Sequence, residues 1–343
     1  MSTPLEAALA VAEGNGLSVR DSSAVGVFEG CSVSVHSQGS QSIWAEVFGS
    51  IEPALDLGLT LGRLRGRGRN AKVVTGNADL DGEFIIEADE PARARILFEG
   101  GLAALLVAYH RRLYEVSLHD AGCSIYISES GGDWVTTALG GVSEVAKLVA
   151  TARPLLPVAT PLAPYAPVFA RFAEDWGLEM QTVPLVVRTP ASGATTREVG
   201  ASLEISATRI ERCQYRLRMV APFWSPLRAG LQLRRRTFAD GVRGFFGEGD
   251  VELGDRSFDD RFEVSAEKKK RTARLLGADT RARLVELDGK FGRVLLDDMG
   301  ICLESGLEQI PPSALPRALE QFVEVVRGLT QNAARRAQRG IYR

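Results

Sequence analysis

The stretch GNADLDGEFII, residues 76–86, organises this chain, because the sequence repeats it as GDRSFDDRFEV, residues 254–264. Residues 76–127 align with residues 254–305 without a gap and share 13 identities over these 52 positions. Within the motif, Gly76, Asp81 and Phe84 recur as Gly254, Asp259 and Phe262. This constant register predicts that the chain is a tandem duplication of one fold unit.

The repeat extends well beyond the motif. Further identities include the pairs Arg93/Arg271, Asp120/Asp298 and Gly122/Gly300. Residues 57–61 match residues 229–233 at an offset of 172 rather than 178, so the second copy has six extra residues before its motif. A short helix predicted over residues 4–12 corresponds to a second one predicted over residues 168–173. Each half therefore contains the same set of elements.

The pattern of apolar and polar residues predicts the fold class. Alternating segments, such as residues 32–36 and 202–206, predict strands with one apolar and one polar face, as antiparallel sheets have. Each half closes with a predicted amphipathic helix, over residues 138–151 and 316–329. The sequence thus predicts an α+β fold: a tandem duplication of an antiparallel-sheet domain with helices packed on one face.

Local signals refine this picture at the motif and at the hairpins. Phe84 and Phe262 are expected to fill the core beside a tight bend, and Asp81 and Asp259 to accept backbone N–H bonds as turn or cap carboxylates. In the later hairpins, which contain Gly122 and Gly300, we expect the glycine to adopt a positive φ. Glu267 begins a predicted helix, and the lysines that follow it, Lys268, Lys269 and Lys270, oppose its dipole.

A proline-rich segment separates the two halves. Residues 154–164 contain a proline at every third or fourth position and are predicted to form a stiff linker. We therefore expect a first repeat domain over residues 1–153, a second over residues 165–330, and a basic C-terminal tail over residues 331–343 that forms a frayed helix.

Charge is unevenly distributed along the chain. The net charge is −2, but residues 1–153 contain 12 basic and 19 acidic residues, against 29 and 24 in residues 154–343. These balances, −7 and +5, allow the halves to attract each other or the second half to bind an anionic partner; solvated surfaces are the alternative. The sequence shows no secretory signal and no membrane-spanning run, and its four cysteines stand singly. We expect a cytoplasmic protein with buried free thiols.

No pattern predicts a catalytic, metal or cofactor site. The chain lacks Gly-x-Ser-x-Gly, and its three histidines, His36, His110 and His119, share no motif. The acidic run around Asp81 invites a calcium interpretation, but Asp79 and Glu83 become Ser257 and Arg261 in the second copy. We therefore predict no catalytic residue, no metal and no cofactor.

Two groups of arginines are candidate binding residues. They lie at corresponding places of the two halves: Arg63, Arg65, Arg67 and Arg69 in the first, Arg234, Arg235 and Arg236 in the second. Such basic segments contact phosphates or acidic proteins, or are simply solvated loop tips. Because the first half is acidic and aromatic residues are sparse, we expect no binding of generic DNA, RNA or anionic vesicles near physiological salt.

The motif Gly-Asp-x-x-Phe-Asp-x-x-Phe-x-Val, followed by an acidic helix start, resembles segments of uncharacterised bacterial proteins described as domains of unknown function. Residues 254–264 match this pattern fully, and residues 76–86 depart from it at Asn77, Leu80 and Ile86. The resemblance covers about a third of each half. It implies kinship of fold and a bacterial origin, and it carries no catalytic residue.

Together these patterns favour a non-enzymatic binding or scaffold protein whose partner is a protein. The alternative is a small-ligand binder or an enzyme with a site in the cleft between the two copies. Oligomeric state, biological process and the identity of the partner stay open at this stage.

Overall fold

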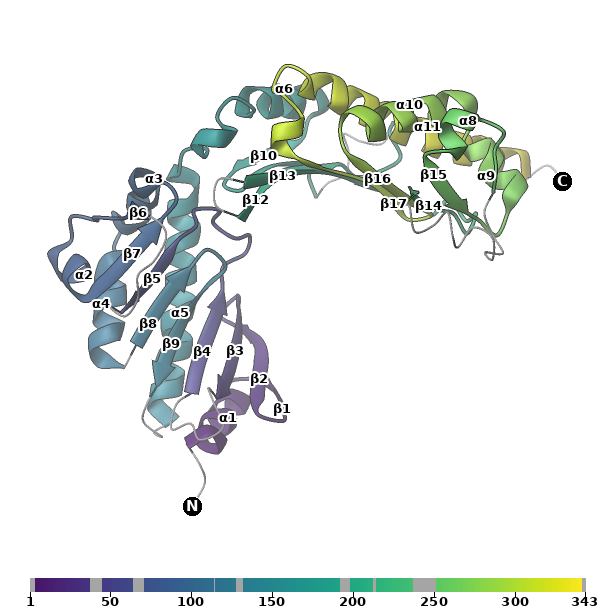
Figure 1. Ribbon diagram of the computed structural model, residues 1–343. Helices are drawn as coiled ribbons and strands as arrows, with labels where there is room; N and C mark the ends of the chain where they lie inside the picture. The colour runs from purple at the N-terminus through teal and green to yellow at the C-terminus, as the bar shows by residue number, and fades with distance from the viewer. Residues whose placement is uncertain are drawn as a thin grey trace. The chain divides into compact units, whose positions relative to one another are not determined.

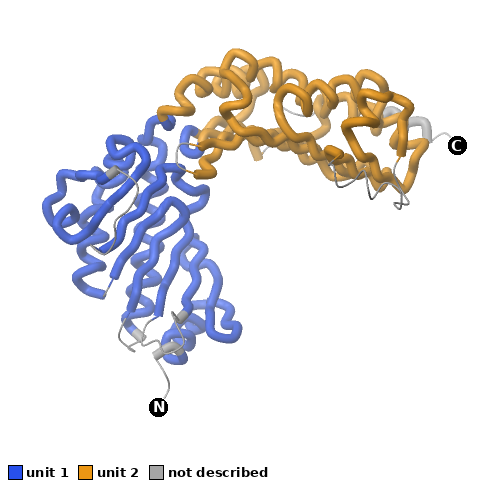
Figure 2. The backbone as a smooth tube through the Cα atoms, in the orientation of Figure 1, with its two compact units in different colours: residues 1–159, 182–184 blue, residues 160–181, 185–343 orange. Residues whose placement is uncertain are grey.

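The computed structural model describes residues 4–37, 45–63, 71–113, 115–127, 132–191, 198–211, 214–236 and 251–340. The chain divides into two compact units, residues 1–159 with 182–184 and residues 160–181 with 185–343 (Figure 2). Of the predicted linker, residues 154–159 belong to the first unit and residues 160–164 to the second.

The first unit contains a nine-stranded antiparallel sheet in the order β1-β2-β3-β4-β9-β8-β5-β7-β6 (Figure 1). Its strands are β1 (Ser18–Arg20), β2 (Ser23–Phe28), β3 (Cys31–Ser37), β4 (Ala45–Ser50), β5 (Thr60–Arg63), β6 (Ala71–Lys72), β7 (Phe84–Ala88), β8 (Glu115–His119) and β9 (Gly122–Ile127). Its helices are α1 (Pro4–Gly14), α2 (Ala78–Glu83), α3 (Pro91–Arg95), η1 (Ile96–Phe98), α4 (Leu102–Arg112), α5 (Gly132–Ala152) and η2 (Arg153–Leu155).

The second sheet has eight strands in the order β10-β11-β12-β13-β17-β16-β14-β15. Its strands are β10 (Glu179–Thr182), β11 (Leu185–Arg188), β12 (Glu204–Glu211), β13 (Gln214–Pro222), β14 (Gln232–Arg235), β15 (Phe262–Ser265), β16 (Arg293–Asp297) and β17 (Gly300–Gly306). The helices are η3 (Thr160–Leu162), α6 (Ala166–Trp176), α8 (Arg256–Asp259), α9 (Lys269–Leu275), α10 (Ala278–Lys290), η4 (Leu307–Gln309) and α11 (Leu315–Gly340).

The two sheets share one topology, which confirms the predicted tandem duplication. Read from one end, each strand of the second sheet takes the place of its counterpart in the first, and β6 alone lacks a counterpart among the described residues. The register agrees as well: Leu61 pairs with Ile86 and Leu118, and Leu233 pairs with Val264 and Leu296. The paired residues of the two sheets are therefore related by the same offsets, 172 and 178, as in the sequence alignment.

Helices cover one face of each sheet, as predicted. In the first unit α5 packs against β3, β4 and β9, α1 packs beside it, and α4 packs against β8 (Figure 1). In the second unit α6 packs against β11, α10 against β16, and α11 against α10. The alternation of buried and exposed side chains along β13 shows that only one sheet face is covered.

The repeated motif contributes to both cores. Leu80, Phe84, Phe258 and Phe262 are each at most 1% exposed, which confirms the expected apolar filling. The predicted positive φ of Gly122 and Gly300 is wrong, because neither glycine adopts it. Glycine is required there by close packing instead. A Cβ on Gly122 would collide with the ring of Phe48, and one on Gly300 would lie 2.8 Å from the carbonyl oxygen of Ala221.

Candidate functional site

In the first unit, the carboxylate of Asp120 is held by a concave row of backbone N–H groups. Leu57 and Leu59 donate to Oδ1 at 3.2 and 3.0 Å, and Gly58 donates to Oδ2 at 2.8 Å. The row is concave because Asp56 and Gly58 have φ values of 54° and 63°. Backbone with alternating left-handed residues forms such anion-binding nests. Asp120 thereby ties the loop before β5 to the β8–β9 hairpin.

The second unit repeats this nest almost atom for atom. Ala229 and Leu231 donate to Oδ1 of Asp298 at 3.1 Å each, and Gly230 donates to Oδ2 at 2.8 Å. Arg228 and Gly230 have φ values of 55° and 62°. The Asp120/Asp298 identity in the sequence therefore marks a structural carboxylate whose ligands are the protein's own amides.

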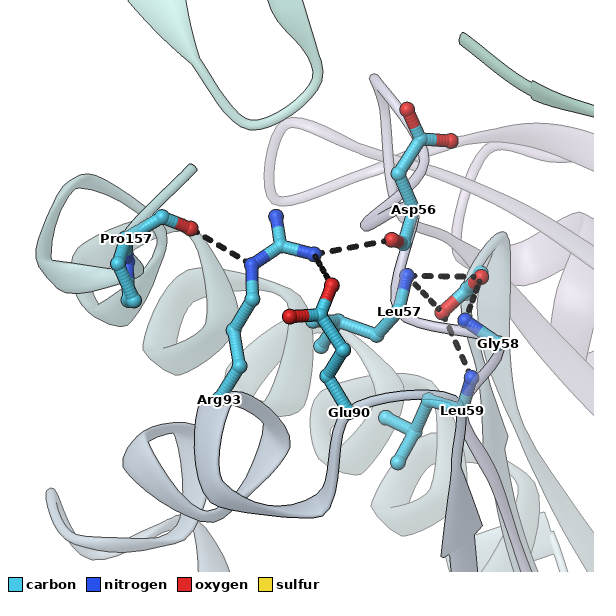
Figure 3. Close-up of polar contacts among 8 residues, drawn as sticks. Asp56, Leu57, Gly58, Leu59, Glu90, Arg93 and Pro157 are labelled. Atoms are coloured by element: carbon cyan, nitrogen blue, oxygen red, sulfur yellow. Dashed lines mark hydrogen bonds and ion pairs between the residues drawn. The ribbon is translucent and has the colours of Figure 1, made fainter. Parts of the chain in front are cut away.

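Next to the first nest, an arginine is buried and fully engaged. Arg93, in α3, is 5% exposed. Its Nε donates to the carbonyl oxygen of Pro157 at 2.6 Å, and its Nη1 donates to the carbonyl oxygen of Asp56 at 3.1 Å (Figure 3). Nη1 also lies 4.0 Å from Oε1 of Glu90. Arg93 thus joins the nest loop, the start of α3 and the segment that follows α5.

The equivalent arginine of the second unit, Arg271 in α9, has lost these acceptors. Lys268 stands in the place of Glu90, since each is the N-cap of its helix. The carbonyl oxygen of Arg228, which corresponds to that of Asp56, accepts from Nζ of Lys268 at 3.2 Å. Nε of Arg271 is buried and has no hydrogen-bond partner among the described residues.

Arg271 lines a cavity of about 460 Å³ that we name the Arg271 pocket. The pocket is bounded by Trp224, Ser225, Arg228, Thr330, Ala333 and Ala334, with Gly200 and Pro226 beside them. Its charged lining residues are the two arginines, and Lys268 adds a third cation next to them. Trp224 is 45% exposed and offers an apolar platform at the rim. A cavity of this size falls in the range of ligand sites, about 300–1,000 Å³.

The position of Arg228 is itself unusual. Left-handed backbone is tolerated by aspartate, as at Asp56, but is unfavourable for most other side chains. The second unit therefore places a base at a strained position where the first has an acid. Strain of this kind gathers at functional sites.

The motif carboxylates fasten the turn before a short helix. Oδ1 of Asp81 accepts from the backbone N–H and the Oγ1 of Thr75, and Oδ2 accepts from the N–H of Gly76. Burial raises the pKa of Asp81, but these hydrogen bonds outweigh it, so the pKa lies below its ordinary value. Asp259 accepts in the same way from the N–H groups of Leu253 and Asp255.

The candidate arginines make internal contacts where the structure describes them. Arg234 pairs with Glu263 at 2.7 Å, and Nε of Arg235 lies 3.6 Å from the buried carboxylate of Asp288. Nε of Arg236 donates to the carbonyl oxygens of Asp259 and Phe262 at 2.8 and 3.1 Å. Arg63 is exposed at the end of β5, and Arg65, Arg67 and Arg69 lie outside the described residues. The structure brings none of these described arginines into the Arg271 pocket.

Two histidines pack on aromatic rings, and Nε2 of His36 lies 3.5 Å from the carboxylate of Glu46. The ring of His119 stacks on Phe48 at 5.9 Å, and His110 packs on Phe84 at 4.8 Å. Burial lowers the pKa of His110.

Of the cysteines, Cys31 and Cys123 are buried as expected, Cys302 is half-buried, and Cys213 lies outside the described residues. Burial raises the pKa of the Cys123 thiol to about 12, so this sulfur is no nucleophile near neutral pH.

The described residues hold no group of three or more His, Cys, Asp and Glu side chains placed for a metal ion. Within the same residues, no helix combines the length and the apolar composition of a membrane-crossing segment.

The sequence patterns did not point to Trp224, Arg228, Lys268 or Arg271 as site residues. The sequence does contain a signal at this site. The arginine is the same in both copies, as Arg93 and Arg271, but two residues near it change from acid to base. Asp56 becomes Arg228, and Glu90 becomes Lys268. Comparing the charges of the two copies, rather than only their identities, finds this site.

Comparison with known proteins adds little to these observations. No protein-family model matches the chain, and no curated protein matches it. Among solved structures, the crystal structure of the mycobacterial trehalose monomycolate transport factor A, TtfA, matches with a TM-score of 0.33 and 9% sequence identity. The match covers 46% of this chain and 98% of that chain. A likeness of this size carries no argument, and kinship with bacterial proteins that share the Gly-Asp motif stays a prediction.

Proposed function

We propose that this protein is a non-enzymatic binding protein that holds an anionic partner in the Arg271 pocket of its second unit. One observation carries the proposal: Arg271 keeps the place of Arg93 in the repeat, but its Nε lacks the carbonyl acceptor that Arg93 has, and Lys268 stands where Glu90 pairs with Arg93. The Nε–H of this guanidinium is buried without an acceptor, and a buried donor left unpaired costs free energy. A bound anion supplies the missing acceptor and offsets the repulsion among Arg228, Lys268 and Arg271.

Two further observations support the same proposal. Arg228 occupies a left-handed backbone position that favours aspartate, which costs stability without any visible gain inside the unit. The excess of basic residues in the second half, +5 over residues 154–343, raises the local concentration of anions around the pocket.

The proposal is tested by isothermal titration of the full chain with pyrophosphate and with poly-L-glutamate. We expect both anions to bind, with an affinity that falls steeply as salt is added, because these charges are screened over about 10 Å at 0.1 M salt. The double variant Arg228→Asp/Lys268→Glu gives the pocket the acids of the first unit and should abolish binding.

A matched control makes the same change in charge elsewhere in the second unit. Arg216 on β13 and Arg293 on β16 are exposed and lie outside the pocket lining. The variant Arg216→Glu/Arg293→Asp should bind both anions like the parent. Equal binding by the parent and by Arg228→Asp/Lys268→Glu, or no binding by either, would show that the proposal is wrong.

A further inference from the structure

The first unit contains a chain segment at the place where the second unit has its pocket. Helices α5 and α11 correspond at an offset of 177, which pairs Val145 with Phe322, both fully buried. At this offset, residues 153–157 correspond to residues 330–334. Thr330, Ala333 and Ala334 line the Arg271 pocket, so the pocket occupies the position of the segment that follows α5.

In the first unit this segment passes through the 3-10 helix η2 and becomes extended at Leu156. Helix α5 ends at Ala152, and Leu156 has φ and ψ of −71° and 126°. The side chain of Leu156 is 2% exposed and joins the core of the unit. The next residue, Pro157, offers its carbonyl oxygen to Nε of Arg93 at 2.6 Å (Figure 3). A short extended peptide thus satisfies the arginine with its backbone and the core with its side chain.

Arg153 joins the start of this segment to another loop of the first unit. Its guanidinium donates to the carbonyl oxygens of Glu52 and Pro53, in the loop that leads to the nest. The corresponding residue of the second unit is Thr330, whose short side chain donates instead to the carbonyl oxygen of Val199 at 2.6 Å.

In the second unit the helix does not end at the corresponding place. Helix α11 continues to Gly340, so residues 330–334 stay helical and none of them turns back over Arg271. Ala333 and Ala334 replace Leu156 and Pro157 with small side chains on a helix surface. The Arg271 pocket lies against these small side chains, and Nε of Arg271 is unpartnered at its wall.

The charges define what fits this space. Asp56 and Glu90 accompany the peptide segment in the first unit, whereas Arg228 and Lys268 stand at these positions in the second. Trp224 takes the place of Glu52 at the offset of 172 and adds an exposed apolar surface. An occupant must therefore supply the negative charge that the first unit supplies from its own chain.

We propose that the Arg271 pocket binds an extended acidic peptide segment of a partner protein. One backbone carbonyl oxygen of the peptide accepts from Nε of Arg271, in the manner of Pro157 on Arg93. Its carboxylates pair with Arg228 and Lys268, and an apolar or proline side chain packs between Trp224 and Ala333. This inference rests on the proposed function and narrows its anionic partner to one class of ligand.

The test is a selection of random dodecapeptides displayed on phage against the immobilised full chain. We expect the enriched peptides to contain several aspartates or glutamates next to leucine or proline, because these residues supply the missing charge and the missing apolar contact. Synthetic copies of them, labelled with fluorescein, then give affinities from fluorescence anisotropy.

Three variants decide where the peptides bind. Arg271→Gln removes the guanidinium and should weaken binding about tenfold or more, since charge-assisted hydrogen bonds of this kind contribute that much. Arg228→Asp/Lys268→Glu should abolish binding, and the matched variant Arg216→Glu/Arg293→Asp should retain it. Peptides without acidic enrichment, or with unchanged affinity for Arg228→Asp/Lys268→Glu, would overturn the inference.

The same measurements separate this inference from the proposed function. If pyrophosphate binds the parent and not Arg228→Asp/Lys268→Glu, but no acidic peptide is selected, the pocket is an anion site and the peptide inference is wrong. If neither pyrophosphate nor any peptide binds, both proposals are wrong. A single-stranded oligonucleotide or a phosphatidylglycerol vesicle that binds at the pocket more tightly than every selected peptide would also overturn the inference.

Discussion

Arg93 and Arg271 begin equivalent helices in the two copies of one fold, but their surroundings carry opposite charges. Arg93 is 5% exposed and donates to two carbonyl oxygens beside a glutamate. Arg271 lines a cavity beside an arginine and a lysine, and its Nε has no acceptor among the described residues. The two nests, by contrast, agree to within 0.1 Å in all three equivalent N–H to carboxylate distances.

This difference separates two kinds of identity between the copies. The Asp120/Asp298 identity preserves contacts, because the backbone that each carboxylate holds has the same shape. The Arg93/Arg271 identity preserves the residue and loses the contacts. The proposed anion site accounts for an arginine that is retained without its internal partners.

The largest effect that we predict is common to both units. Asp120→Ala and Asp298→Ala each leave three backbone N–H groups of a largely buried loop without an acceptor. At about 1 kcal/mol or more for each unsatisfied group, each variant should lose about 3 kcal/mol of unfolding free energy. Urea denaturation followed by circular dichroism measures this loss. If only one of the two variants loses unfolding free energy, the two nests are not equivalent in their contribution to stability.

The second prediction separates the two arginines. Arg93→Gln should destabilise the chain by about 2 kcal/mol, because a buried guanidinium and its charge-assisted bonds to Pro157 and Asp56 are removed. Arg271→Gln should leave the unfolding free energy unchanged or raise it, because it removes a buried Nε–H that has no acceptor and a cation that is repelled by its neighbours. Equal destabilisation by both substitutions in the same urea titrations would show that Arg271 is a structural residue like Arg93.

Much of the fold was predictable because it follows from local patterns. Alternating apolar residues predict the strands, and the duplicated register places Phe84 and Phe262 in equivalent core positions, where they are each 1% exposed. The last helix was predicted in two parts, a closing helix that ends at residue 329 and a frayed helical tail, whereas α11 runs without a break from Leu315 to Gly340. Residues 330–339 contain neither glycine nor proline, so nothing local ends the helix before Gly340.

The candidate site was less predictable because contacts distant in the sequence create it. Pro157 accepts from Arg93 across 64 positions of the chain, and Asp120 binds a loop that lies 61 to 63 positions before it. No local motif encodes such a contact. The site becomes visible in the sequence only when Asp56 and Glu90 are compared with Arg228 and Lys268 across the two copies.

The third prediction concerns the repeated motif. Asp81→Ala and Asp259→Ala should each cost about 1 kcal/mol of unfolding free energy, by removal of a carboxylate that fastens the turn before a short helix. The pKa of Asp81 is lowered in the folded state, so its contribution is complete above the unfolded pKa of about 3.9 and is lost as pH falls below it. The stability difference between the parent and Asp81→Ala should therefore shrink below about pH 4. A difference that grows in acid would contradict this account.

The smallest predicted effect comes from the variant that gives the second unit the acidic residues of the first. Arg228→Asp/Lys268→Glu removes the repulsion around Arg271, places aspartate at a left-handed position that suits it, and puts a carboxylate at the start of α9. The melting temperature should rise by about 2 °C at low salt, although the bond from Lys268 to the carbonyl oxygen of Arg228 is lost. The gain should diminish at 1 M salt, where charges are screened over about 3 Å. Arg216→Glu/Arg293→Asp, measured by the same calorimetry, should give no gain. If the pocket variant melts at or below the parent's temperature at low salt, the three bases do not repel one another, and the electrostatic contrast between the two arginines fails.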